Sequence, residues 1–539
     1  MAGVNDRWPT LRPDRVPREL AQHWRSTGAW TDETIGDLLE RSAAAWPERT
    51  AVTTAEGRVT FGELHAQSSA IARTLVDAGV QRGDVVCWML PTGPEAIAVA
   101  SAIWRIGAVS SPIVPLAGVG DMANVFAQVR PTAVIAVREH RRRTLTDELD
   151  QALADANLDP ARLVVGAAAH GWRPADASGP GSLPAGVTPG DPFDPCLILF
   201  TSGTESAAKG VLHSAAALHH ELRSTIAEWG LTFRDSMVMA SPMTHITGLL
   251  QGFLIPARVG ASAVLMDRWD PAECVDLIEH TGATYMAGAA PFLRGILDAY
   301  RSSGLDRSSL RQFCSGGAAV HPELVEGIQE FGVAAYRAWG MTELPTSSFS
   351  NELDSLEHRS MTDGRLAPGV ELRVLADDGS ALPRGEVGEL QLRGPEMMLG
   401  YVLPEHDARA FTEDCWLRTG DMGSLGSDGC VRITGRLKEI INRGGEKFSA
   451  REIEDAVLKH PDITQAAVVA VADERLGEQI GVAVVSSRTD LSVAEIGRVV
   501  TSTGLSRYKQ PEHLVIVDEL PTNATGKTDK NRVARLFES

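Results

Sequence analysis

Short apolar runs alternate with segments of helical periodicity between about residues 84 and 322, and this alternation constrains the fold more than any other feature of the sequence. Apolar runs of strand length occur at residues 85–90, 133–137 and 197–200. The spacing of helices is found at residues 94–106, 215–229, 271–280 and 291–300. Because strands that alternate with helices form layered α/β structure, we predict a largely parallel sheet in this region.

The pattern changes after about residue 369, where apolar and polar residues alternate between Gly and Pro turns and predict a β-rich subdomain. A separate apolar set follows at residues 463–471, 480–485 and 514–517. This set indicates a small α+β domain with its own core, beyond a boundary near residues 435–445. Within it, Ser449 and Glu452 have the spacing of a capping box, which predicts a helix start.

Composition excludes several functional classes. The chain has 539 residues, 43% of them hydrophobic, and a formal net charge of −19, so we expect several folded units and no nucleic-acid partner. Its six cysteines form no C-x-x-C pair, which argues against a disulfide framework or a zinc cluster. The first 18 residues lack the apolar core of an export signal, and no run of about 18 apolar residues could span a membrane. We therefore expect a cytoplasmic protein, and leave its oligomeric state open.

A loop that could hold phosphate follows the apolar run at residues 197–200. Its sequence, T-S-G-T-E-S-A-A-K-G at residues 201–210, can present backbone N–H groups, hydroxyls and the Lys209 ammonium to an anion. It is not a Walker loop, because Gly210 follows the lysine and no Ser or Thr comes directly after it. Taken alone, the segment is also compatible with an ordinary turn from a strand to a helix.

The same string resembles the signature loop of the adenylate-forming superfamily, which contains acyl- and aryl-CoA ligases, adenylation domains of peptide synthetases and firefly luciferase. The usual form is T-S-G-T-T-G-x-P-K-G, so this chain departs from it at Glu205, Ser206 and Ala208. Further family segments follow in order: P-M-T-H-I-T-G at 242–248, S-G-G-A at 315–318, W-G-M-T-E at 339–343, W-L-R-T-G-D at 416–421, G-R-L-K-E-I-I at 435–441 and P-T-N-A-T-G-K at 521–527. Three stretches, residues 111–115, 241–250 and 266–271, look like cyclohexanecarboxylate and medium-chain acyl-CoA ligases.

The resemblance implies a carboxylic acid:CoA ligase that uses ATP and Mg²⁺ to form an acyl adenylate and then transfers the acyl group to CoA. It implies ATP-binding roles for Thr201, Ser202, Gly203, Thr204, Lys209, Gly316, Gly317, Trp339, Gly340, Asp421 and Arg436. By the same resemblance, Thr342 donates to the α-phosphate, Glu343 and Thr204 hold Mg²⁺, and His245 gates the carboxylate pocket. Lys527 would bridge the substrate carboxylate and the α-phosphate, where negative charges must come together.

The family also implies a rotation between the two steps about a hinge that corresponds to Lys438. We therefore predict an α/β fold with a large N-terminal layered α/β domain that includes the β-rich subdomain, residues 1–437, and a small mobile α+β C-terminal domain, residues 438–539. By resemblance, Gly444 and Gly445 belong to the face that lines the pantetheine tunnel for CoA, where glycine permits close backbone approach.

Substrate and acceptor are less constrained. Peptide-synthetase domains place an aspartate for the substrate ammonium four residues before the gating position, where this chain has Ser241. The expected pocket is small or apolar, and consists of Met243, Ile246, Gly248, Gly288, Ala289, Ala290 and Gly316. A neutral aliphatic, alicyclic or simple aromatic acid fits it best. Two alternatives stay open: a stand-alone acyl-AMP ligase that loads an acyl carrier protein, and a non-catalytic acyl or nucleotide binder.

Overall fold

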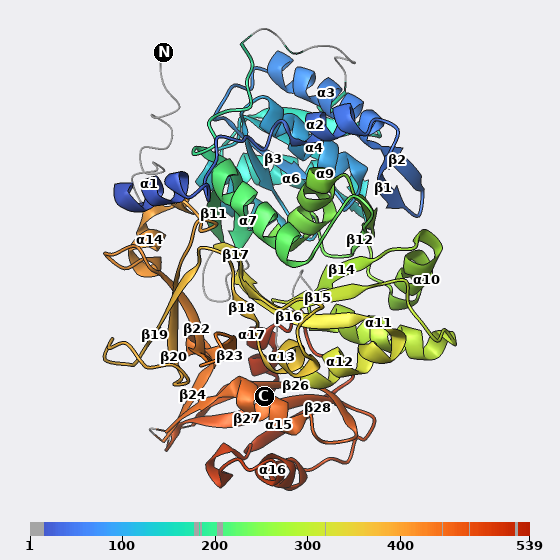
Figure 1. The fold of residues 1–539 in the computed structure, drawn as a ribbon. Coiled ribbons are helices and arrows are strands. Elements are labelled where there is room, and N and C mark those ends of the chain that lie inside the picture. Colours follow the sequence, from blue (N-terminus) through green and yellow to red (C-terminus); the bar gives the residue numbers. More distant parts are fainter. Residues whose placement is uncertain are drawn as a thin grey trace.

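The computed structural model describes residues 16–176, 183, 186–201, 208–317, 320–444, 446–473, 475–522 and 527–538. Figure 1 shows two layered α/β units in the upper and middle parts of the molecule, an antiparallel sheet beside them, and the C-terminal sheet with its helices at the bottom. This arrangement confirms the predicted fold class.

The first sheet has eight strands, in the order β21 (Gly400–Tyr401), β11 (Lys209–Ser214), β10 (Pro195–Thr201), β4 (Val109–Pro112), β3 (Val85–Met89), β5 (Ala133–Val137), β8 (Ala161–Val165) and β9 (Arg173–Pro174). All neighbours from β10 to β9 are parallel, whereas β11 and β21 run antiparallel at one edge. The helices in this part of the chain are α3 (Phe61–Asp77), α4 (Pro94–Arg105), α5 (Val119–Val129) and α6 (Leu145–Asp155). A short hairpin, β6 (Glu139–His140) and β7 (Arg143–Thr144), precedes α6.

The second sheet has nine strands, in the order β18 (Arg365–Leu366), β17 (Leu344–Phe349), β16 (Ala334–Met341), β15 (Gln312–Gly316), β14 (Tyr285–Gly288), β12 (Ser236–Met239), β13 (Ser262–Leu265), β1 (Thr50–Thr54) and β2 (Gly57–Thr60). Its six central strands are parallel, as predicted. Helices of this part are α1 (Arg18–Ser26), α2 (Leu38–Ala45), α7 (Ala215–Glu228), α8 (Ile246–Leu249), α9 (Ile255–Val259), α10 (Pro271–Thr281), α11 (Ala290–Ser303), α12 (Pro322–Gly327) and α13 (Leu356–Met361). A π-helical turn, Leu250–Leu254, joins α8 to α9.

The predicted β-rich subdomain is an antiparallel sheet of β19 (Glu371–Leu375), β20 (Gly388–Arg393), β22 (Leu417–Leu425) and β23 (Val431–Arg436), accompanied by α14 (Pro404–Ala410). The C-terminal sheet contains β25 (Glu446–Ser449), β24 (Ile440–Arg443), β27 (Gly477–Ser486), β26 (Ile463–Asp473) and β28 (His513–Val517). Its helices are α15 (Ala450–Val457), α16 (Val493–Ser502) and α17 (Lys530–Ala534). This sheet buries an apolar core of its own, which includes Ile453, Val468 and Ile496.

One local prediction is wrong. Ser449 does precede α15, but its side chain caps no N–H group of that helix. The hydroxyl instead donates to the carbonyl oxygen of Thr434 on β23, at 2.7 Å, and Glu452 accepts from Lys509 at 2.5 Å. The Ser449 hydroxyl and the Glu452 carboxylate, which would form a capping box, therefore bond to Thr434 and Lys509 instead.

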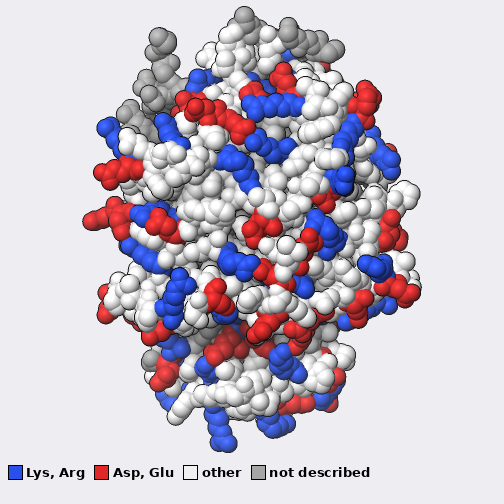
Figure 2. All heavy atoms as spheres, viewed as in Figure 1, with Lys and Arg blue, Asp and Glu red and all other residues white. Residues whose placement is uncertain are grey.

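The surface carries both signs of charge. On the face shown in Figure 2, Lys and Arg are interspersed with Asp and Glu. Across the described part of the chain, no helix is long and apolar enough to cross a membrane. The six cysteines are all free thiols, as the sequence indicated.

Candidate active site

Four of the family segments, far apart in sequence, meet around one cavity of about 120 Å³. It lies at the carboxyl ends of β14, β15 and β16, the usual position of a ligand site in an α/β sheet. Seven of the predicted site residues line it: His245, Gly316, Gly317, Trp339, Gly340, Thr342 and Lys527. The structure thus brings the core of the expected site together.

Glycines allow the walls of this cavity to come close. A Cβ atom on Gly340 would lie 1.8 Å from the carbonyl oxygen of Pro345, and one on Gly316 would lie 2.7 Å from that of Ala338. Gly317 has φ of +76°, and a Cβ there would lie 3.1 Å from Nζ of Lys527. The terminal lysine therefore rests against backbone that only glycine can provide.

Lys527 is largely removed from water. Burial, assisted by the positive charge of Arg436, lowers the pKa of Lys527 to about 8, although the Asp421 carboxylate acts in the opposite direction. His245 lies in the same cavity, and burial together with the Lys527 charge lowers its pKa to about 4. At neutral pH the cavity thus combines a cationic lysine with an uncharged histidine.

Because Lys527 must be charged to draw two anions together, adenylation should depend on pH. We expect kcat/KM for adenylation to fall about tenfold per pH unit above about pH 8, since the lysine ammonium of the free enzyme is lost there. The measurement is a pH profile of pyrophosphate release. In Lys527→Arg the side chain stays charged to beyond about pH 12, so its residual activity should lose this decline. A wild-type profile that stays flat to pH 10 would contradict the assignment.

Asp421, on β22, forms side-chain hydrogen bonds with residues on β16 and β23 at one edge of the cavity. Its Oδ2 accepts from Nε1 of Trp339 at 2.8 Å and its Oδ1 accepts from Nε of Arg436 at 3.0 Å, while the residue itself is only 5% exposed. A carboxylate offers about four lone-pair positions, so each oxygen can accept one further hydrogen bond. The group therefore fits the two hydroxyls of a ribose, and Arg436, whose side chain is half exposed, can donate to the same sugar.

Glu343 lies next to the predicted phosphate loop. Its Oε1 accepts from the hydroxyl of Tyr401 at 2.6 Å, and the Nζ atom of Lys209 sits 5.5 Å from the centre of the Tyr401 ring. Thr201 and Lys209 are direct partners in the β10–β11 ladder, so the loop begins and ends at this point. Mg²⁺ prefers one or two carboxylates together with phosphate oxygens, and a single carboxylate beside a phosphate loop fits that requirement.

Several predicted residues lie elsewhere. Ser202, Gly203, Thr204 and Gly445 fall outside the described residues. Lys438 is exposed in a short 3-10 helix, Leu437–Glu439, between β23 and β24. Gly444 is exposed at the β24–β25 turn, with φ of +61°, and its N–H donates to the carbonyl oxygen of Leu476 at 2.7 Å. These hinge and tunnel candidates are not among the described residues that line the cavity.

The acid end of the cavity differs in part from the expected pocket. Ser241, Ile246, Gly288, Ala289 and Gly316 line it. The other expected residues, Met243, Gly248 and Ala290, are not among its described lining residues: Met243 and Ala290 pack in the apolar cores, and a Cβ on Gly248 would lie 2.0 Å from the carbonyl oxygen of Pro242.

Eight described lining residues belong to none of the motifs and to none of the expected pocket positions: Trp229, Leu250, Gln251, Ala287, Cys314, Ala338, Pro345 and Thr346. Sequence reasoning missed these residues, and it also missed His213. The Nε2 atom of this buried histidine is 2.8 Å from the carbonyl oxygen of Thr342, and burial lowers its pKa to about 4, so the neutral ring donates and fixes the turn after β16. The apolar strand pattern at β11 was the only available signal for it.

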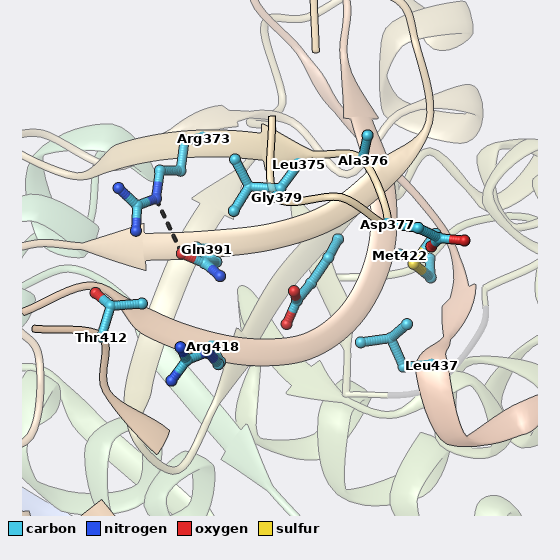
Figure 3. A pocket seen from close by; sticks show the side chains of 11 residues that line it. Arg373, Leu375, Ala376, Asp377, Gly379, Gln391, Thr412, Arg418, Met422 and Leu437 are labelled. Atoms are coloured by element: carbon cyan, nitrogen blue, oxygen red, sulfur yellow. Dashed lines mark hydrogen bonds between the residues drawn. The ribbon is translucent and has the colours of Figure 1, made fainter. Parts of the chain in front are cut away.

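A second, larger cavity of about 470 Å³ lies on the β-rich sheet, outside the site just described. In Figure 3, Arg373, Thr412 and Arg418 lie toward one end of it, and Asp377, Met422 and Leu437 toward the other. Arg373 donates from Nε to Oε1 of Gln391 at 2.9 Å. Leu437 begins the 3-10 helix that contains Lys438, so this cavity adjoins the predicted hinge.

Comparison with known proteins places the chain in a family. Residues 39–402 match the model for AMP-binding enzymes, and residues 452–527 match that for the C-terminal domain of the same enzymes. The chain is 33% identical over 525 residues to a medium-chain fatty-acid–CoA ligase of Escherichia coli (strain K12), with 94% of this chain and 91% of that protein covered. It is 29% identical to a salicyl-AMP ligase/salicyl-S-ArCP synthetase of Mycobacterium tuberculosis, with 96% and 93% covered.

Among solved structures, ATP-bound MatB from Rhodopseudomonas palustris is similar with a TM-score of 0.83 and 25% identity, over 93% of this chain and 99% of that one. An anthranilate CoA ligase in complex with anthranoyl-AMP shares the fold, with a TM-score of 0.85 at 22% identity over 94% and 98% of the two chains. With both family models matched and the site assembled at the ends of β14 to β16, the chain belongs to the family of AMP-binding, adenylate-forming enzymes.

Proposed function

We propose that this protein is an ATP-dependent, AMP-forming carboxylic acid:CoA ligase that acts on a compact, neutral acid through an acyl adenylate. The observation that carries the proposal is the position of Lys527, which lies in one cavity with His245 and Thr342 and beside the Asp421–Arg436 pair. The similarity to a medium-chain fatty-acid–CoA ligase over nearly the whole chain supports the same reaction class.

In the first step, ATP with Mg²⁺ supplies the adenylyl group. Asp421 and Arg436 would orient its ribose, and Lys209 and Thr201 would hold the outer phosphates. Thr342 would donate to the α-phosphate from the turn that His213 fixes. Lys527 would offset the repulsion between the substrate carboxylate and the α-phosphate, and the buried site excludes water from the activated acid.

The lining at the acid end of the cavity supports a compact, neutral acid. Ile246, Gly288 and Ala289 there are small or apolar. The described lining contains no carboxylate that could pair with a substrate ammonium. An α-amino acid would bury an unpaired charge there, at a high cost in free energy.

For the second step we propose a rotation of residues 438–539 relative to residues 1–437, about Lys438. Among the described residues, two ion pairs on exposed side chains cross between these parts, Lys447 with Asp377 at 2.7 Å and Lys459 with Glu323. The His321 ring, whose pKa is lowered by burial, also lies 3.3 Å from the Asp455 carboxylate. The rotation would withdraw Lys527 and bring the turn that contains Gly444 toward the acyl adenylate, so that CoA can attack it.

A carrier protein is the second candidate for the acceptor, and one observation favours it. The similar Mycobacterium tuberculosis protein is named as both a salicyl-AMP ligase and a salicyl-S-ArCP synthetase. The match covers 96% of the present chain. A carrier protein presents the same phosphopantetheine thiol as CoA, so both acceptors would use the adenylation residues described above.

The proposal is tested by AMP release from ATP, measured with purified protein and a panel of compact neutral acids. We expect AMP to accumulate over many turnovers only when both CoA and an acid of one class are present. Pyrophosphate release without CoA-dependent turnover would instead indicate a carrier protein as acceptor. Failure to release AMP or pyrophosphate with any acid would contradict the proposed function.

A further inference from the structure

Tyr401 contacts two side chains of opposite charge that are proposed to bind Mg²⁺ and phosphate. Its hydroxyl donates to Oε1 of Glu343 at 2.6 Å, and the Nζ atom of Lys209 lies over its ring, 5.5 Å from the centre. The ion pairs of the described residues include none between Lys209 and Glu343. The carboxylate and the ammonium therefore share one aromatic neighbour without being bonded to each other.

The position of the Tyr401 ring is fixed by the residues around it. Tyr401 lies on β21, opposite Val211 of β11 in the antiparallel ladder. Its N–H donates to Oδ1 of Asp407 at 2.8 Å, and the His406 ring packs edge-on against its ring at 5.8 Å. Because the residue is only 5% exposed, its side chain has little freedom to follow Glu343 if that carboxylate moves.

The segment that contains Tyr401 also holds the main chain of Glu343. The N–H of Met398 donates to the carbonyl oxygen of Glu343 at 2.8 Å. Residues 398–401 thus fix both the backbone of Glu343 and one of its carboxylate oxygens. Glu343 is partly exposed, and no hydrogen bond from a described residue reaches its Oε2. That oxygen can ligate Mg²⁺ together with phosphate oxygens, and a partner that orients a ligating carboxylate controls metal affinity.

Without the Tyr401 hydroxyl, the Lys209 ammonium would be the competing partner for Glu343. Opposite charges attract more strongly near a protein surface than in bulk water, and both side chains are only partly exposed. An ion pair between them would occupy the carboxylate that Mg²⁺ needs and the ammonium that phosphate needs. The hydrogen bond from Tyr401 opposes that pairing.

We infer that Tyr401 is a positioning residue, which holds the Glu343 carboxylate and the Lys209 ammonium apart and so leaves one for Mg²⁺ and the other for the phosphates of ATP. This inference rests on the proposed function and adds a residue that supports its ATP site. Tyr401 acts through these two side chains and is not itself a catalytic residue. Phenylalanine at this position would keep the ring beside Lys209 but leave Glu343 without its donor.

The test is the dissociation constant of ATP, measured by titration calorimetry with and without Mg²⁺. Acid and CoA are left out, so that the measurement reports binding alone. The ratio of the Mg²⁺-free value to the value with Mg²⁺ gives the contribution of the metal. In Tyr401→Phe this ratio should fall about tenfold, because loss of a group that orients a metal ligand usually lowers metal affinity 10- to 100-fold. A dissociation constant does not depend on the folded fraction of the sample.

Tyr300→Phe is the matched control. Tyr300 lies on α11 with its side chain fully buried, and its hydroxyl donates to Oε1 of Glu279 at 2.6 Å, the same contact that Tyr401 makes with Glu343. This variant should have a lower melting temperature and keep the wild-type ratio, because Tyr300 does not contact the groups proposed to bind ATP.

Two further backgrounds show whether Tyr401 acts through Glu343 and Lys209. Glu343→Gln should lower the ratio by itself, and adding Tyr401→Phe should lower it no further, because the hydroxyl acts on that carboxylate. In a Lys209→Met background, Tyr401→Phe should lower the ratio by less than about threefold, since Glu343 then has no ammonium to pair with.

A wild-type ratio in Tyr401→Phe would overturn the inference and leave the proposed ligase intact. A tenfold decrease that persists in either background would also overturn it, because the hydroxyl would then act through other groups. An unchanged ratio in Glu343→Gln alone would remove Glu343 from the metal site and the inference with it. Failure of the proposed function would be seen separately, as the absence of AMP and pyrophosphate release with every acid.

Discussion

Replacing Lys527 with alanine should lower acyl-adenylate formation by about 10²- to 10³-fold, the usual effect of losing one preorganised group that stabilises charge in a transition state. The physical reason is the position of the ammonium, buried in the cavity beside Gly317 and close to Asp421 and Arg436. Without it, nothing at that point offsets the repulsion between the two reacting anions. Pyrophosphate exchange, which reports on the first step alone, is the appropriate measurement.

The second step should survive this change. Thioester formation from a supplied acyl adenylate and CoA should proceed at close to the wild-type rate in Lys527→Ala, because Lys527 is proposed to leave the site before CoA attacks. Lys509→Ala provides a control in the same domain, since Lys509 pairs with Glu452 within the C-terminal part and does not line the cavity. If both steps fell by the same factor, the role assigned to Lys527 would be wrong.

The Gly340→Ala substitution should also strongly lower the rate of acyl-adenylate formation. An added Cβ would lie 1.8 Å from the carbonyl oxygen of Pro345, so the β16–β17 hairpin must open. That hairpin carries Thr342 and Glu343 at its turn, and a shift of about 1 Å in such groups can cost 10²-fold in rate. We expect adenylation to fall by at least about 10²-fold, together with a lower melting temperature.

The matched control for this substitution is Gly120→Ala. Gly120 lies in α5, where an added Cβ meets no atom within 4 Å, so this variant should keep both its activity and its melting temperature. Wild-type adenylation in Gly340→Ala would show that the hairpin tolerates displacement and that its turn does not position the reacting groups.

Much of the fold follows from local pattern. The apolar runs at β3, β5 and β10 and the helices α4, α7, α10 and α11 were expected within a few residues of their observed bounds, because their periodicity matches their burial. Residues from four separate motifs, at His245, Gly317, Gly340 and Lys527, meet in one cavity. Their order along the chain was visible in the sequence. Their chemical roles stay predictions, as do the domain limits.

What the sequence could not predict depends on tertiary contacts. Trp229, Gln251 and Thr346 come together only because α7, the π-helical turn and β17 pack around the same space. No spacing along the chain encodes that packing. For the same reason Ser449, which has the sequence of a capping box, donates across to Thr434 instead.

In the proposed rotation, the contacts that join the C-terminal sheet to the rest of the molecule must break and form again in each turnover. Lys447–Asp377 and Lys459–Glu323 are surface ion pairs, and such pairs contribute about 0–1 kcal/mol each. Releasing these two pairs would cost only about 2 kcal/mol at most. The rotation must also release the hydrogen bond from the Ser449 hydroxyl to Thr434 and withdraw Lys527 from Gly317. Weak surface pairs of this kind would let the proposed adenylating arrangement form and break repeatedly, so that withdrawal of Lys527 and approach of the CoA thiol would alternate within one turnover.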